Sequence, residues 1–200
     1  MKKIILLLTL YGTSNLIYSQ PGQLDPSFGS NGIVRNSFGP KINESTEGRQ
    51  VLLQADGSIY ILTETKEQTL IAKRLKNGSP DSSYGNNGFS ASVPFYGAHA
   101  AMQLDGKIVV AGTSSNRDYP FNIDIGVARF NTNGSLDNTF NGNGEITINW
   151  GSGESARNVV IQKDGKIIVG GNEHNEGSTQ GLVLMFNQNG GLDHTIIKEK

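Results

Sequence analysis

The stretch MQLDGKIVVAG, residues 102–112, returns in nearly the same form as IQKDGKIIVGG, residues 161–171. Each copy has an Asp-Gly pair at its centre, Asp105-Gly106 and Asp164-Gly165. Asp-Gly between apolar segments is a strong hairpin signal, because a type I′ turn needs positive φ at both central residues. The β-branched run after each pair indicates a strand that is buried on both faces. We therefore expect two short antiparallel strands around each Asp-Gly pair.

The two stretches belong to a longer internal repeat. Asp25, Asp81, Asp137 and Asp193 stand 56 residues apart, whereas the Asp-Gly pairs are 49 and then 59 residues apart. Loops tolerate changes of length at a small entropic cost, so the drifting positions mark loops and the fixed positions mark framework. The fixed spacing defines three repeats, residues 24–79, 80–135 and 136–191, and the start of a fourth at Leu192.

Each repeat contains four segments with the composition of a strand. Two flank the Asp-Gly pair, a third ends at an Asn-Gly pair, and a fourth follows it; the third segments are 70–75, 125–130 and 182–186, and the fourth are 33–38, 89–95 and 144–150. The 26 glycines and the lack of a sustained 3.6-residue period argue against helices. Tandem four-stranded antiparallel units are typical of β-propeller blades, which bury their faces against neighbouring blades. The sequence therefore predicts an all-β fold of three propeller-type blades, a partial or open propeller.

The repeated motifs resemble the delta-60 repeat, a bacterial unit placed among β-propeller domains of unknown function. The resemblance covers residues 24–195 and is clearest at 103–107, 128–135 and 136–140. The chain departs from the pattern at Ser58, where Lys is expected, at residues 73–76, where Ala-Arg-aromatic-Asn is expected, and at Leu184-Met185, where Ala-Arg is expected. The resemblance implies a propeller-like fold and secretion or surface display, and it implies no reaction.

The first 19 residues have the pattern of a secretory signal peptide. Lys2 and Lys3 precede an apolar run, residues 4–10, which is too short to span a bilayer. A small residue at Ser19 suits cleavage before Gln20, which leaves residues 20–200 as the repeat domain. The chain has no cysteine, so it has no disulfide and no lipid-bearing cysteine. We expect a secreted or cell-envelope protein of bacterial type, without a transmembrane segment.

The charge balance does not indicate a nucleic-acid partner. The chain has 17 basic and 18 acidic residues, and a nucleic-acid-binding face would need clustered basic residues. We also expect no cofactor: the G-x-G-x-x-A pattern at residues 151–156 lacks the helix that a dinucleotide site requires. The oxygen-rich segment 131–137 lacks the final Glu of a calcium loop, so hairpin-turn chemistry explains it better and we expect no metal site.

Three blades are fewer than the four to eight that propellers typically have. An open arc would expose strand edges and apolar faces. Three explanations stay open: the chain is a fragment of a longer propeller protein, it associates with itself to complete a ring of six blades, or it folds as a short open stack. A nonfunctional truncated product is a further possibility.

Functional residues are expected where the repeats differ, because repeated residues usually serve the framework. Arg74 and Arg129, for example, are interpreted as equivalent residues that pair with Asp81 and Asp137. The longest unique loop is predicted at residues 113–122, with a counterpart at 172–178 on the same rim. In the first of these loops a basic and aromatic contact patch is a hypothesis, formed by Arg117, Tyr119 and Phe121.

We expect an exported binding or scaffold module without catalytic residues, whose rim loops contact a glycan or a protein. The alternative is a carbohydrate-active hydrolase. It would be recognised by two carboxylates close together in a pocket, outside the repeated positions.

Overall fold

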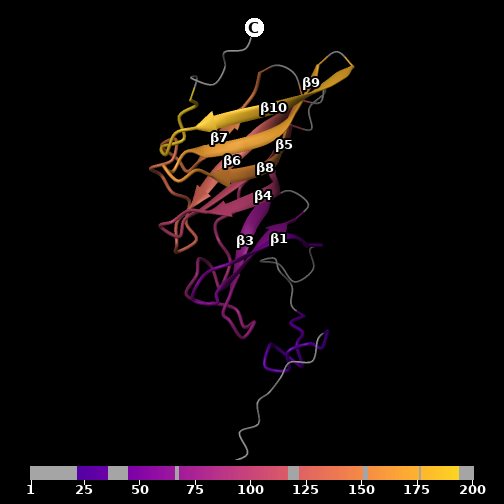
Figure 1. Ribbon diagram of the computed structural model, residues 1–200, viewed down its shortest axis with the longest axis vertical. Helices are drawn as coiled ribbons and strands as arrows, with labels where there is room; N and C mark the ends of the chain where they lie inside the picture. The colour runs from indigo at the N-terminus through magenta and orange to yellow at the C-terminus, as the bar shows by residue number, and fades with distance from the viewer. Residues whose placement is uncertain are drawn as a thin grey trace, which may run out of the picture.

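The computed structural model describes residues 22–35, 45–65, 68–116, 122–150, 153–175 and 177–193, and these residues form ten strands and no helix. The strands are β1 (Glu47–Leu53), β2 (Ile59–Glu64), β3 (Thr69–Arg74), β4 (Tyr96–Met102), β5 (Ile108–Asn116), β6 (Asn122–Phe130), β7 (Glu145–Ile148), β8 (Gly153–Ile161), β9 (Ile167–Asn175) and β10 (Ser178–Phe186). They form three antiparallel sheets, ordered β1-β2-β3, β4-β5-β6-β7 and β8-β9-β10, that follow one another along the molecule (Figure 1). We call them the first, middle and third sheets. The predicted all-β fold of a partial, open propeller is confirmed.

The hairpin turns differ from the predicted type I′ form. Gly106 has a positive φ of 82°, but Asp105 before it does not. The Gly106 N–H donates to Gln103 O (3.0 Å) and the Gln103 N–H donates to Lys107 O (2.8 Å). This is a three-residue loop, a type I turn followed by a left-handed glycine. Asp105 stays at negative φ because its Oδ1 accepts the Lys107 N–H (3.1 Å).

The sheets are offset from the sequence repeat. Strand β7 belongs to the repeat 136–191, but it pairs with β6 of the preceding repeat, with Ile148 opposite Ile125. The predicted fourth strand at 89–95 forms only single bridges to the first sheet, at Phe89 and Val93. Between these two bridges the Ile71 N–H donates to the Ser90 hydroxyl oxygen (2.8 Å) and the Ala91 N–H donates to Gly134 O (2.8 Å), so no continuous strand ladder forms there. The repeats 80–135 and 136–191 thus each give their leading segment to the sheet before them.

The first strand of each sheet, β1, β4 or β8, contains a β-bulge at the same place, at Arg49, Ala98 and Arg157. Beside this bulge the backbones of the first two strands come close together in the middle and third sheets, whereas Thr63 stands at that place in the first sheet. A Cβ on Gly171 would lie 2.1 Å from Ser155 O, and one on Gly112 would lie 2.0 Å from Tyr96 O. The glycine that ends each quoted stretch is therefore required by the approach of the neighbouring backbone.

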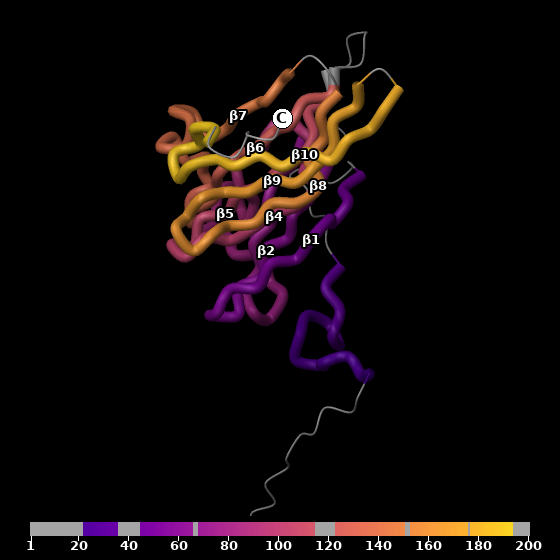
Figure 2. Tube along the Cα trace, turned by 45° about the horizontal axis from the view of Figure 1, so that its top comes forward, coloured from indigo at the N-terminus to yellow at the C-terminus, as the bar shows by residue number. Residues whose placement is uncertain are grey.

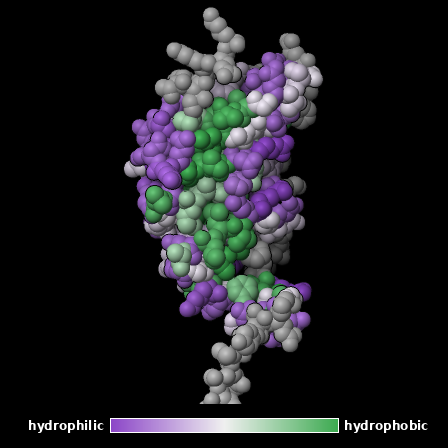
Figure 3. Space-filling model, viewed as in Figure 1, coloured by the Kyte–Doolittle hydropathy of each residue, from purple (hydrophilic) through white to green (hydrophobic). Residues whose placement is uncertain are grey.

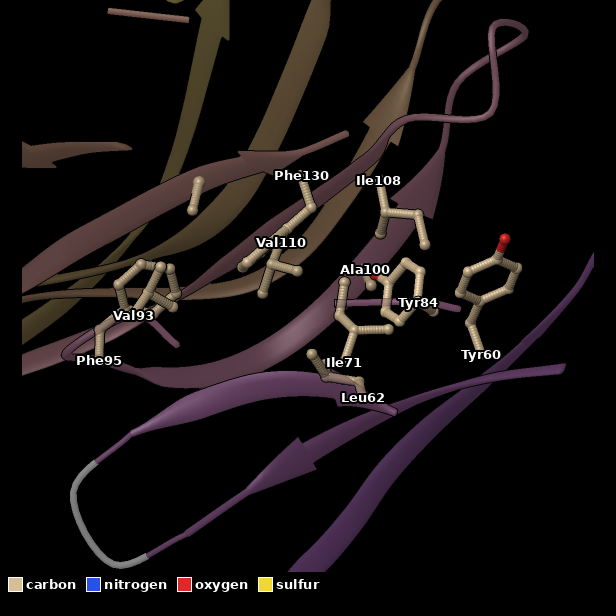
Figure 4. Packing of buried hydrophobic residues seen from close by; sticks show 11 residues of the cluster. Tyr60, Leu62, Ile71, Tyr84, Val93, Phe95, Ala100, Ile108, Val110 and Phe130 are labelled. Atoms are coloured by element: carbon tan, nitrogen blue, oxygen red, sulfur yellow. The ribbon is translucent and has the colours of Figure 1, made fainter. Parts of the chain in front are cut away.

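The core consists of two apolar layers, one on each side of the middle sheet. The first lies between the first and middle sheets and includes Leu62, Ile71, Val110 and Phe130 (Figure 4). In it the rings of Tyr60 and Tyr84 meet edge to face at 5.8 Å. The second layer lies between the middle and third sheets and includes, among others, Val109, Val127, Phe140, Val159, Ile167 and Phe186. Each sheet therefore completes the core of its neighbour, as the repeat predicts.

Candidate functional site

The predicted contact patch, Arg117, Tyr119 and Phe121, lies outside the described residues. The structure does give the ends of its loop: β5 continues to Asn116 and β6 begins at Asn122. The predicted counterpart loop, 172–178, is mostly strand, because β9 continues to Asn175, which pairs with Ser178. Backbone pairing extends this hairpin beyond the apolar core, and Figure 2 shows it projecting from the side opposite the β8–β9 turn.

A groove of about 500 Å³ lies at the other rim, between the middle and third sheets. Two hairpin turns form its walls, the β4–β5 turn and the β8–β9 turn, and the turn after β10 closes one end. Most of its lining residues have polar side chains, although apolar atoms supply the larger part of the lining surface; the residues are Gln103, Leu104, Asp105, Lys107, Arg129, Thr139, Ile161, Gln162, Lys163, Asp164, Gly165, Gln188 and Asn189. Amide side chains thus converge on the groove from three turns.

Gln103 has an unsatisfied group in this groove. Its Oε1 is buried and has no hydrogen-bond partner in the part of the chain that the structure describes. Gln54 stands at the same place in the first sheet, where its Oε1 accepts the Tyr60 hydroxyl (2.9 Å). A buried acceptor without a donor costs free energy, so a turn of the Gln103 side chain toward the groove would be favoured when a ligand hydroxyl or N–H is there to donate to it.

The base of the groove is a charged network around Asp137. Its Oδ2 accepts from Arg129 Nε (2.7 Å) and from Lys107 Nζ (2.9 Å), and its Oδ1 accepts from Thr139 Oγ1 (2.7 Å). Burial by itself raises the pKa of Asp137, but the hydrogen bonds from Lys107 and Thr139 and the charge of Arg129 outweigh it and hold that pKa far below its usual value. The Arg129 guanidinium lies 5.0 Å from the Phe140 ring centre. These charges are engaged with one another and hold the groove rigid.

The repeated carboxylate is paired in each of the three sheets, at Asp81, Asp137 and Asp193, but by different cations. Lys73 Nζ lies 2.9 Å from Asp81 in the first sheet, and Lys166 Nζ lies 2.9 Å from Asp193 in the third. Lys73 and Arg129 are equivalent, because each accepts the N–H of the following Asp at its carbonyl oxygen. Two of the departures from the repeat motif explain this difference. Ser58 replaces the cation that Lys107 and Lys166 supply, and Met185 replaces the cation that Lys73 and Arg129 supply, so one cation remains in each of these sheets.

The predicted equivalence of Arg74 and Arg129 is therefore wrong by one residue. In the strand register Arg74 pairs with Ile59 as Phe130 pairs with Ile108. Arg74 is buried, and its guanidinium lies 5.6 Å from the Phe89 ring centre. Alternation explains the error, because a shift of one residue in a strand moves a side chain to the other face.

Two buried carboxylates that sequence reasoning missed lie where the middle and third sheets meet, at the end away from the groove. Asp124 on β6 is 9% exposed and Glu154 on β8 is 0% exposed. Burial first, and then the charge of Glu154, raise the pKa of Asp124 against a hydrogen bond from Asn149. The corresponding positions carry Gln68 in the first sheet and Phe95 before the middle sheet, so both carboxylates break the repeat. That departure was the only available signal.

The oxygen-rich segment 131–137 forms a turn. Asn133 Oδ1 accepts both the N–H and the hydroxyl of Ser135, at 3.0 and 2.8 Å. Within the described ranges, no group of three or more His, Asp or Glu side chains is placed to hold a metal ion. His99, on β4, accepts the Val159 N–H (3.4 Å) and so links the middle and third sheets.

The structure is thus that of a β-propeller-type array. A family model described as a domain of unknown function (DUF5122), beta-propeller, matches residues 103–140 and 162–195. The match confirms the resemblance drawn from the repeated motifs, and the two matched stretches contain both turns that wall the groove. No curated protein matches the chain. Among the residues that the structure describes, no helix is long and apolar enough to cross a membrane.

Proposed function

We propose that the protein is an exported, non-catalytic binding module that holds a glycan in the groove between the middle and third sheets. The observation that carries the proposal is the unpartnered Gln103 Oε1, which lies among further amides from Gln162, Gln188 and Asn189. Amides donate and accept hydrogen bonds, which suits a ligand with many hydroxyls. The groove's charged base is internally paired, which favours rigid binding over reaction.

The test is binding of the full chain to an array of bacterial and plant oligosaccharides, followed by titration calorimetry with the sugar that binds best. Gln103→Ala should weaken binding about tenfold, since one hydrogen bond contributes about 1 kcal/mol or somewhat more. Gln54→Ala is the matched control, because its amide lies at the same position in the first sheet and is satisfied by Tyr60. Equal effects of the two variants would refute the proposed groove.

Export is tested separately. The pattern of residues 1–19 supports removal of a signal peptide, and the first residue of the exported protein should then be Gln20. Amino-terminal sequencing of material recovered from outside the expressing cell would show this, and an intact Met1 there would contradict it.

A second candidate, a glycoside hydrolase, is favoured by Asp124 and Glu154. Such enzymes use two carboxyl groups, one with a raised pKa that acts as the acid. The pKa of Asp124 is raised by its burial and by Glu154, although both groups are covered in this structure. Release of reducing sugar from a polysaccharide panel, abolished by both Asp124→Asn and Glu154→Gln, would support this candidate over the binding module.

A further inference from the structure

Equivalent residues differ in exposure according to whether a next sheet is present. Ile71, Val127 and Val183 stand at one repeat position, on the side that faces the following sheet. Ile71 is 2% exposed and Val127 is 0% exposed, each within an apolar layer, whereas Val183 is 61% exposed. The third sheet therefore presents a face of the kind that the other two sheets bury.

The first sheet has an exposed face of the complementary kind, on the side where the other two sheets pack against a preceding sheet. Val51, Ala100 and Val159 are equivalent in the strand register and point toward the preceding sheet. Ala100 is 2% and Val159 is 1% exposed, whereas Val51 is 64% exposed. The two ends of the array thus carry the two halves of the interface that the array forms twice internally.

Both open faces are apolar. On the third sheet the open face is formed by Val160, Ile168, Val183 and Met185, of which Val160 is 53% exposed. On the first sheet the open face includes Val51, Leu53, Ile59 and Ile61, and Leu53 is 71% exposed. Figure 3 shows an apolar band that runs over β8–β10 and on along the molecule. Exposed apolar surface of this extent marks an association site.

A segment in front of the first sheet supplies a further part of the interface. The Gly29 N–H donates to Asn77 O (3.0 Å), as the Gly85 N–H donates to Asn133 O (2.8 Å) across the junction of the first and middle sheets. In complete junctions Gly88 O and Gly144 O then accept an N–H from β3 or β6. Gly32 stands at the same repeat position. Among the described residues no strand equivalent to β3 or β6 lies beside it to donate an N–H to its carbonyl oxygen.

We propose that two copies of this chain close into one ring of six sheets, in which the third sheet of each copy packs on the first sheet of the other. A second copy is the occupant because the mating faces are successive units of one repeat, and the two internal junctions show how such units pack. Six sheets lie within the range of closed propellers, and two identical junctions satisfy two-fold symmetry.

At each junction the leading segment of one copy completes the third sheet of the other. Gly32 O then accepts from Met185 N–H of the second copy, in the place that Gly88 and Gly144 occupy for Lys73 and Arg129. Leu24–Asp25 and Leu192–Asp193 stand at the same repeat position. In the ring, Leu24–Asp25 of one copy and Leu192–Asp193 of the other would occupy the same place, so only one of these two segments is seated at each junction.

The first test is the mass of the full chain in solution, measured by light scattering after size exclusion. The natural chain should have twice the mass of one copy. Val183→Asp and Val51→Lys each place a charge in both junctions and should each yield a single copy, whereas Val183→Ile should remain a dimer. A natural chain that is a folded monomer would overturn the proposal and point to further repeats as the neighbour.

A mixing experiment distinguishes this ring from pairing of like faces. When Val183→Asp and Val51→Lys chains are mixed, one junction is natural and the other joins the two substituted positions, which carry opposite charges. The mixture should recover the dimer, which also shows that both variants fold. If Val51→Lys alone stays dimeric, the third sheet pairs with itself and the proposed ring is wrong.

Discussion

Strands β6 and β10 occupy the same place in successive repeats, yet their environments differ. In β6, Val127, Ala128 and Phe130 are all 0% exposed, because sheets cover both faces. In β10, Leu184 and Phe186 are buried against the middle sheet, but Val183 is 61% exposed. The comparison shows that burial in this fold is conferred by the neighbouring sheet and not by the strand's own sequence.

The largest expected effect comes from placing a charge at this position in each strand. Val127→Asp buries a carboxylate without a partner and should lower the free energy of unfolding by at least about 4 kcal/mol. Val183→Asp should change it by no more than about 0.5 kcal/mol once the chain is a single copy. Urea unfolding of Val183→Asp with and without Val127→Asp gives the first value, and comparison of Val183→Asp with the single-copy Val51→Lys chain checks the second. Similar losses at both positions would mean that the open face is covered within one chain.

Adjacent glycines in β9 sharpen the comparison between the two faces of the third sheet. Gly171→Ala places a Cβ against Ser155 O and should cost about 2 to 3 kcal/mol. A Cβ on Gly170 would meet nothing within 4 Å, and Ala111 stands at that place in the middle sheet. Gly170→Ala should therefore raise stability by about 0.5 kcal/mol, because glycine is unfavourable within a strand.

Thermal and urea unfolding of both variants gives the two changes side by side. Backbone relaxation at the bulge would make Gly171→Ala as mild as Gly170→Ala, and the steric explanation of the repeated glycine would then fail.

The repeated Asp provides an acid-dependent comparison of the middle and third sheets. Asp137 accepts hydrogen bonds from four donors and has a pKa far below 3.8, whereas Asp193 pairs with the partly exposed Lys166. A carboxyl group whose pKa is lowered by folding stabilises the fold above its unfolded pKa, and this contribution is lost as the pH falls through the folded pKa. Asp137→Asn should cost about 3 kcal/mol at pH 7 and should remove stability that the natural chain loses below about pH 4.

Unfolding measured from pH 7 down to pH 2 tests this. Asp193→Asn is the matched variant and should have a smaller effect, since solvent screens its pair. If Asp193→Asn lowers stability as much as Asp137→Asn does, the second cation and the fourth strand of the middle sheet add nothing to the stabilising effect of the repeated Asp.

The sequence predicted the architecture because local signals and the repeat agreed. Alternation, the Asp-Gly and Asn-Gly pairs and the 56-residue spacing each favoured short antiparallel strands, and the structure has them. The Asp105-Gly106 turn was assigned to the wrong type because the dipeptide occurs in both turn forms. The Asp105 side chain decides the form by accepting the Lys107 N–H.

The site could be predicted only in part. The spacing marked Asp81, Asp137 and Asp193 as framework but could not select the cation for each, since Lys107 approaches Asp137 from the β4–β5 turn and Arg129 approaches it from β6. The groove and the Asp124–Glu154 pair depend on how two sheets pack across many residues of sequence. No local pattern encodes that packing.

The smallest expected effect lies at the buried carboxylates, where the middle and third sheets meet. Folding raises the pKa of Asp124, so its contribution to stability is most favourable below pH 3.8 and declines as the pH rises through the folded pKa. Asp124→Asn keeps the shape of the side chain and removes the repulsion from Glu154. It should therefore be more stable than the natural chain at pH 7, with a difference that shrinks toward pH 4.

Asp105→Asn is the control for this change, and it should leave stability nearly unchanged. The exposed Asp105 accepts the Lys107 N–H in its turn, and Asn133 accepts the Ser135 N–H in the same way, so an amide can take the place of this carboxylate. A loss of stability in Asp124→Asn at pH 7 would contradict the expectation, since it would mean that a cation or a proton donor favours the ionised pair. That outcome would strengthen the hydrolase candidate, because carboxylates kept charged inside a seam at a cost to folding are more readily explained by chemistry than by packing.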